Sequence, residues 1–149
     1  MTLNCTNDDA QQKFERQAYG EAANYTETNF QGDVVQQDTD DWRISPLYQG
    51  LAEVRPIFPN PIQYGSNINL EVELNGATTG TIIELGYLNE SNSWFPLQIQ
   101  DIISDYELVT FVVDTRQFGG SAEQARGIHR MLLFDGNQRL ISYGDLLIQ

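Results

Sequence analysis

The most reactive side chains in this sequence belong to one histidine, His129, and one cysteine, Cys5. Nucleophilic catalysis needs a base beside the nucleophile, and His129 is the only imidazole available. Cys5 lies at the opposite end of the sequence, inside a polar segment. One cysteine and one histidine also exclude a structural zinc site, which takes four such ligands. We therefore expect His129 on the face of a strand, and we expect no enzyme.

Carboxylates offer a second kind of chemistry, the binding of hard cations such as calcium. Six of the acidic residues lie in two clusters. Asp38, Asp40 and Asp41 form the first, and Asp101, Asp105 and Glu107 form the second. Neither cluster has the glycine and distal glutamate spacing of a helical calcium loop. Solvated acidic loops therefore compete with calcium binding as the interpretation, and no other cofactor is expected.

The charge balance narrows the range of partners. The chain has 21 acidic and 8 basic residues in 149, for a formal net charge of -13. Such a surface repels phosphate backbones and anionic membranes, so nucleic-acid binding is not expected. No apolar stretch approaches the length of a membrane helix.

Cys5 has a second interpretation besides a free thiol. It stands near the start of the sequence and is followed by the polar run Thr6 to Asp9. A mature bacterial lipoprotein begins with a lipidated cysteine and a polar tether of this kind. If Cys5 is lipidated, that anchor provides the membrane contact.

The sequence divides near residue 45. Residues 1–44 carry nine acidic and three basic residues and few large apolar ones. They predict an extended, acidic N-terminal arm, in which Asp8 and Asp9 indicate a cap for a short helix over 10–18. Such an arm cannot build a core of its own.

Residues 45–149 alternate apolar and polar side chains with the period of β-strands. Strands are expected at 51–58, 68–74, 83–87, 94–99, 109–113, 128–134 and 139–148. Asp135 to Gln138 supplies a hairpin turn, and the continuously apolar run Ile128 to Phe134 indicates a central strand. About seven strands separated by turns predict an all-β, immunoglobulin-like sandwich.

Two groups of apolar residues could contact a partner. In the arm, the candidates are Phe30, Val34, Val35, Trp42 and Ile44, which could add to a sheet edge of another subunit or lie along their own sandwich. In the domain, Trp94 and Phe95 could stack on a sugar ring, although aromatic residues also pack in cores.

The run Val54 to Pro61, V-R-P-I-F-P-N-P, resembles the opening of small immunoglobulin-like domains in envelope and secreted proteins of Gram-negative bacteria. Its last four residues are similar to the entry of the C-terminal sorting domains of type IX secretion, and Gly127 to Gln149 resembles their closing hairpin. The chain departs from those domains because no lysine lies near its C-terminus and no cargo domain precedes the sandwich. With Cys5, the resemblance implies a small envelope lipoprotein.

These observations together predict a non-catalytic extracytoplasmic protein in the bacterial cell envelope or outside the cell. We expect an interaction or structural subunit of an envelope or surface assembly, attached through its N-terminal arm to a protein partner or to further copies of itself. A carbohydrate-binding β-sandwich module is the alternative.

Overall fold

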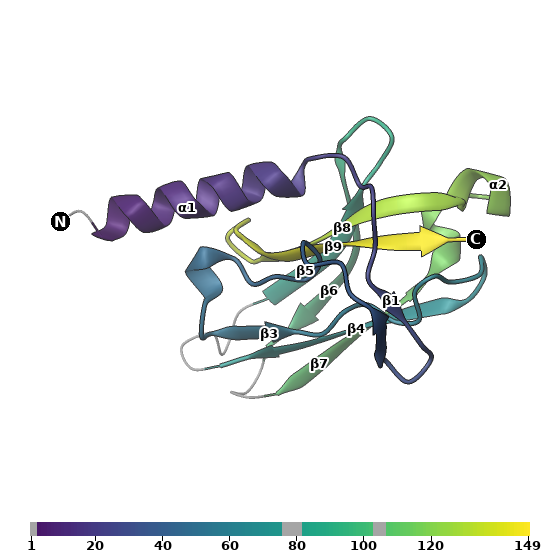
Figure 1. Ribbon diagram of the computed structural model, residues 1–149, viewed down its shortest axis with the longest axis horizontal. Coiled ribbons are helices and arrows are strands. Elements are labelled where there is room, and N and C mark those ends of the chain that lie inside the picture. Colours follow the sequence, from purple (N-terminus) through teal and green to yellow (C-terminus); the bar gives the residue numbers. More distant parts are fainter. Residues whose placement is uncertain (1–2, 76–81, 103–106) are drawn as a thin grey trace.

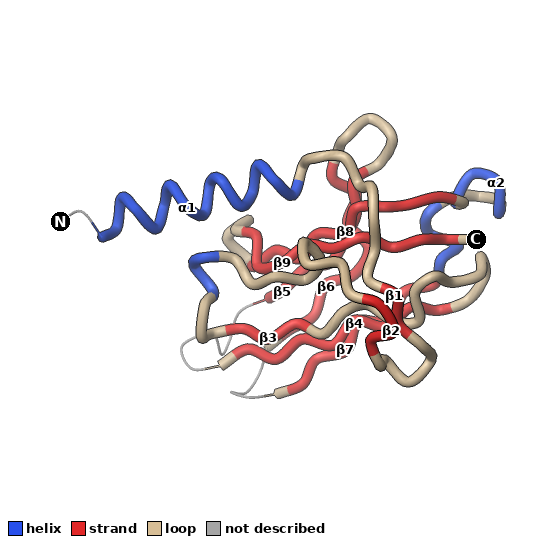
Figure 2. Tube along the Cα trace, viewed as in Figure 1, coloured by secondary structure: helices blue, strands red, loops and turns tan. Residues whose placement is uncertain are grey.

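The computed structural model describes residues 3–75, 82–102 and 107–149, which form two facing sheets, a long helix and a small hairpin (Figures 1 and 2). In chain order the elements are α1 (Leu3–Ala18), β1 (Glu27–Thr28), β2 (Val34–Gln36), the 3-10 helix η1 (Pro46–Tyr48), β3 (Ala52–Val54), β4 (Asn67–Leu74), β5 (Ile82–Leu88), β6 (Trp94–Asp101), β7 (Leu108–Asp114), the 3-10 helix η2 (Thr115–Phe118), α2 (Ala122–Ala125), β8 (Gly127–Asp135) and β9 (Leu140–Ile148). No helix of the described residues has the length and apolar character needed to span a membrane.

The two facing sheets confirm the predicted all-β sandwich. One has the strand order β3-β4-β7 and the other β6-β5-β8-β9, and all neighbours are antiparallel. The expected strand over 51–58 is shorter than predicted, because only β3 and an isolated bridge at Phe58 form there. The hairpin turn over 135–138 joins β8 to β9, as expected.

Side chains of alternating strand positions fill the space between the sheets. In β4, Ile68, Leu70, Val72 and Leu74 are all buried, whereas the residues between them face outward. They meet Leu85 of β5 and Met131 of β8 from the opposite sheet. Each fully buried aliphatic side chain of this kind stabilises the fold by about 1.5–3 kcal/mol relative to an exposed one.

Helix α1 covers the outer face of the four-stranded sheet. A second buried cluster joins Phe14 and Ala18 of α1 to Leu132, Phe134, Tyr143 and neighbouring residues of that face. Strand β8 thus has one side against the main core and the other against the helix. This arrangement accounts for the continuously apolar run that predicted a central strand.

The N-terminal arm differs from the prediction in its first part. The short helix predicted over 10–18 is present, but it is longer than predicted, because α1 begins at Leu3, before the expected cap at Asp8 and Asp9. The helix forms because its apolar positions Phe14 and Ala18, four residues apart, lie on the one face that meets the sheet. Residues 19–44 are largely extended, and they contain the short hairpin β1–β2.

Candidate functional site

The segment after the hairpin runs along β9, the edge strand of the larger sheet. The amide of Trp42 donates to the carbonyl oxygen of Tyr143 at 2.6 Å, and the amide of Ser45 donates to that of Ile141 at 2.9 Å. The indole of Trp42 lies against Gly144, where an added Cβ would come within 2.3 Å of it. The arm therefore pairs with its own sandwich.

This placement corrects the predicted contact surface for two residues. Trp42 belongs to the main core and is only 5% exposed, and Ile44 packs against the same core. Trp42 is thus buried against its own sandwich and Ile44 is partly buried there, so neither presents a fully exposed side chain. Of the predicted contact residues of the arm, Phe30, Val34 and Val35 are exposed.

A buried ion pair fastens the arm to the larger sheet. The Arg130 guanidinium of β8 binds both carboxylate oxygens of Asp145 on β9, and both side chains are almost fully buried. It also donates to the carbonyl oxygens of Gln17 and Ala18 at the C-terminal end of α1, and it lies over the ring of Tyr143. Arg130 therefore stabilises the helix end, where unpaired carbonyl groups favour a cation.

A second carboxylate lies beside this pair. Asp41 accepts hydrogen bonds from the backbone amides of Thr26, at 2.7 Å, and Asp145, at 3.2 Å. Burial and the nearby charge of Asp145 raise the pKa of Asp41 to about 7. Asp41 is thus a second buried carboxylate beside the Arg130–Asp145 pair, and its charge helps to raise the pKa of Arg130.

Asn60 completes the buried polar cluster from the other side of the arm. Its side chain is fully buried, donates to the carbonyl oxygens of Thr26 and Asp145, and accepts from the amide of Leu147. The flanking prolines both follow cis peptide bonds. The proline motif thus places a polar side chain where it closes the β9 edge, a role that the sequence alone did not reveal.

The β1–β2 hairpin presents the most exposed apolar residues of the arm. Phe30 is 82% exposed, Val34 46% and Val35 61%. The turn between the strands is fixed by Asn29, whose side-chain oxygen accepts from the amides of Gln31 and Asp33. The hairpin projects from the body of the molecule (Figure 2), so we name Phe30, Val34 and Val35 the hairpin tip.

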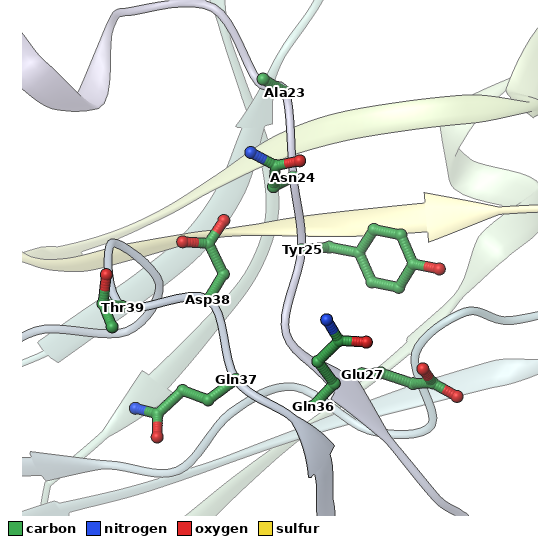
Figure 3. A pocket seen from close by; sticks show the side chains of 8 residues that line it. All are labelled: Ala23, Asn24, Tyr25, Glu27, Gln36, Gln37, Asp38 and Thr39. Atoms are coloured by element: carbon green, nitrogen blue, oxygen red, sulfur yellow. The ribbon is translucent and has the colours of Figure 1, made fainter.

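At the base of the hairpin lies a polar recess of about 420 Å³ between residues 23–27 and 36–39 (Figure 3). Tyr25 and Glu27 project to one side of it and Gln37 and Thr39 to the other (Figure 3). Asp38 is joined across it to Thr26 through both its amide and its carbonyl group. These bonds make the recess a junction between two chain segments.

A second cavity, of about 450 Å³, has aromatic residues at its floor, and we call it the end pocket. It lies between the turn after β5 and the segment formed by η2 and α2. The rings of Tyr87 and Phe118 are 4.5 Å apart between centroids, and that of His129 lies 5.7 Å from Tyr87 and 5.0 Å from Phe118. The polar side chains Asn89, Glu90 and Gln124 also line the pocket.

His129 is neutral in this setting. Burial lowers its pKa, although the hydrogen bond to Ala125 and the charge of Glu90 act in the opposite direction. Its Nε2 lies 2.6 Å from the carbonyl oxygen of Ala125. Since a carbonyl can only accept, Nε2 carries the proton and Nδ1 is left as an acceptor.

Trp94 and Phe95 do not form one sugar-stacking platform. Neighbouring residues of a strand point to opposite faces. Trp94 packs on the helix-covered face, with its ring 4.9 Å from that of Phe134. Phe95 lies on the other face, 5.4 Å from Tyr87, and is 45% exposed. The two residues are neighbours in the sequence, but only Phe95 lies toward the end pocket, next to the ring of Tyr87.

The remaining predicted sites are placed as follows. Cys5 belongs to α1, in its N-terminal part. Of the second acidic cluster, Asp105 lies outside the described residues. Within the part of the chain that the structure describes, no three histidine, cysteine or acidic side chains are grouped to hold a metal ion.

No protein-family model matches this chain, and no curated protein sequence matches it. A chain in a solved structure on T cell specificity and activation by the bacterial superantigen toxic shock syndrome toxin-1 is similar over 66% of this chain and 99% of that chain. The two chains are 11% identical, with a TM-score of 0.40. A similarity of this size establishes neither a shared fold nor a shared function.

Proposed function

We propose that this protein is a non-catalytic interaction subunit of a bacterial envelope or surface assembly, and that it contacts a protein partner through the hairpin tip. The observation that carries the proposal is the 82% exposure of Phe30, beside the exposed Val34 and Val35. Removing large apolar side chains from water in an interface lowers the free energy of the complex. Aromatic residues are also frequent among the residues that dominate binding.

The charge around the tip indicates the chemistry of the partner. Residues 17–42 contain no lysine or arginine, and Glu27 and Asp33 flank the tip in the hairpin. We therefore expect the partner to offer an apolar recess bordered by lysine or arginine side chains. Complementary charges of this kind accelerate association, and salt weakens their effect.

The base of the hairpin favours contact without rearrangement of the arm. Thr28 exchanges backbone hydrogen bonds with Asn60, and its hydroxyl group donates to the carbonyl oxygen of Ile57. Trp42 fixes the other end of the segment in the core. A tip held in this way loses little conformational entropy on binding. Partner contact through the tip is thus favoured over exchange of the whole arm between subunits.

The envelope location rests on the resemblance of Val54 to Pro61 and on Cys5. The N-terminal turns of α1 extend past the sheets (Figure 1). A helix of 16 residues is about 24 Å long, at about 1.5 Å per residue. A lipid on Cys5 would therefore hold the acidic sandwich away from an anionic bilayer, which would otherwise repel it.

Replacing Phe30 with glutamate should weaken partner binding strongly and leave folding unchanged. The substitution places a charge where the partner must be apolar, and we expect the affinity to fall by about 30-fold or more. A photo-crosslinking phenylalanine analogue at position 30 of the full chain identifies the partner in the native cells. Calorimetry with that purified partner then compares wild type with Phe30→Glu at low and high salt.

Val112→Glu is the matched control, since Val112 is 48% exposed on the outer side of β7. This variant carries the same change of charge and should bind the partner as the wild type does. Equal binding by Phe30→Glu and wild type would rule out the hairpin tip as the contact. Crosslinks of the same strength from positions 30 and 112 would do so as well.

A further inference from the structure

The end pocket has the features of a ligand site, independently of the hairpin tip. Its volume of about 450 Å³ falls within the range of about 300–1,000 Å³ that is usual for small-molecule sites. Such sites combine apolar or aromatic walls with a few polar groups that orient the ligand. Here the aromatic floor is Tyr87, Phe118 and His129, and Asn89, Glu90 and Gln124 supply the polar groups.

The hydrogen-bonding state of the two amides restricts the ligand. The side-chain oxygen of Asn89 accepts from the amides of Ser91 and Ser93, and that of Gln124 accepts from the amide of Gly120. The oxygens are thus engaged in holding turns, and the two NH₂ groups remain as donors. Two such donors favour a ligand with acceptor oxygens and disfavour a simple cation.

The ionisable groups of the pocket exclude an anion. Glu90 lines the pocket as a carboxylate acceptor, and no basic side chain is among the lining residues of the described chain. His129 is neutral for the reasons given above, and burial raises the pKa of Tyr87, so its hydroxyl group stays protonated. The ligand must therefore accept from the amides and donate to Glu90 without a negative charge.

We propose that the end pocket binds a neutral saccharide. Ring hydroxyl groups both donate and accept, which suits the amide donors, the carboxylate of Glu90 and the imidazole of His129. Phe95, 45% exposed and 5.4 Å from Tyr87 between ring centroids, offers an aromatic face at this side of the sandwich for the apolar side of a sugar ring.

The single histidine makes the test specific to the site. The full-length protein is titrated with neutral oligosaccharides, namely cellohexaose, maltohexaose, xylohexaose and mannohexaose, and the ring signals of His129 are followed by NMR. We expect at least one of these sugars to shift the His129 signals in a saturable way. Choline and a sulfated sugar serve as the cationic and anionic probes and should leave the signals unmoved.

Two exposed residues of β6 provide matched variants. Phe95→Ala should weaken saccharide binding about tenfold or more, because the aromatic face is lost. Ile99→Ala removes a side chain of 55% exposure from the same strand and should bind as the wild type does. The proposal is overturned if none of the four sugars shifts His129, if choline alone does, or if Phe95→Ala leaves the affinity unchanged.

Discussion

Replacing Arg130 with methionine should lower the free energy of unfolding by about 3–5 kcal/mol. The substitution retains a long apolar side chain but leaves the buried carboxylate of Asp145 without its cation, next to the second buried carboxylate of Asp41. It also removes the guanidinium donors to the carbonyl oxygens of Gln17 and Ala18, so the C-terminal end of α1 is held less firmly. Burial lowers the pKa of Arg130, but the hydrogen bonds to Asp145 and the charge of that carboxylate together raise it above its usual value, so the guanidinium is fully charged in the wild type.

Urea denaturation of the full chain measures this loss, and Arg116→Met is the matched control. Arg116 forms an ion pair with Asp114 at 2.9 Å, but the side chains are 65% and 34% exposed, far more than those of the buried pair. An exposed pair is screened by water and salt, so this variant should unfold at the urea concentration of the wild type. Equal stability of Arg130→Met and Arg116→Met would show that the buried pair does not fasten the arm.

Hydrogen exchange should locate the effect of Arg130→Met within the fold. The amides of α1 are expected to lose protection first, since the helix is held to the sheet by Arg130 and by the cluster around Phe14. Amides of β4 belong to the core between the sheets and should change less. A uniform loss over both elements would mean that helix and sandwich unfold as one cooperative unit.

The sequence predicts the strands of the sandwich well, and the reason is physical. In a strand with one buried face, apolar and polar side chains alternate every two residues. The alternation over Ile68 to Leu74 therefore predicts a strand whatever elements lie beside it. The same holds for the hairpin turn after Phe134, where Asp135 accepts from the amides of Asn137 and Arg139. Both patterns are local in the sequence, so they do not depend on how the strands are arranged in the fold.

The fate of the arm depends on contacts that are distant in the sequence. Trp42 is buried because Gly144, about a hundred residues later, leaves space for an indole on β9. The helix exists as a docked element because the outer face of the sheet presents Leu132 and Phe134 to Phe14. The spacing of apolar residues within 1–44 does not indicate those distant partners. Removal of these residues would therefore uncover the outer sheet face, rather than release an intact sandwich from a tether.

The candidate sites show the same limit. The end pocket combines residues of β5, η2 and β8, which are separated by tens of positions in the sequence. Phe118 and Gln124 have no motif of their own, and a strand pattern places His129 on a face but not in a pocket. The exposed residues of the hairpin tip are easier to predict, since Phe30, Val34 and Val35 are apolar residues in a polar segment.

The protein should be more stable at mildly acidic than at mildly alkaline pH because of Asp41. Its pKa is about 7 in the folded protein, against an ordinary value of 3.8. Between those values the folded state binds more protons than the unfolded state, so stability is lost as the pH rises through 7. From about pH 8 down to about pH 5.5, we expect Asp41 to raise the free energy of unfolding by about 2 kcal/mol.

Urea denaturation at both pH values of wild type, Asp41→Asn and Asp40→Asn separates this effect from the net charge. Both variants lose one negative charge, but Asp40 is exposed, whereas Asp41 is 6% exposed. The pH dependence should shrink in Asp41→Asn and persist in Asp40→Asn. An equal pH dependence in the two variants would assign it to the overall charge of -13 instead. His129, with its lowered pKa, opposes the trend equally in all three proteins.

Arg130 and Asp41 belong to the same buried cluster, so the effects of Arg130→Met and of pH on stability should depend on each other. If Arg130 compensates the buried carboxylates, its removal should cost less once a proton has neutralised Asp41. The difference in stability between wild type and Arg130→Met should therefore be smaller at the acidic pH than at the alkaline pH. A difference that does not change with pH would mean that Arg130 acts mainly on the carbonyl groups of Gln17 and Ala18. The cluster would then hold the helix to the sheet without sensing the proton on Asp41.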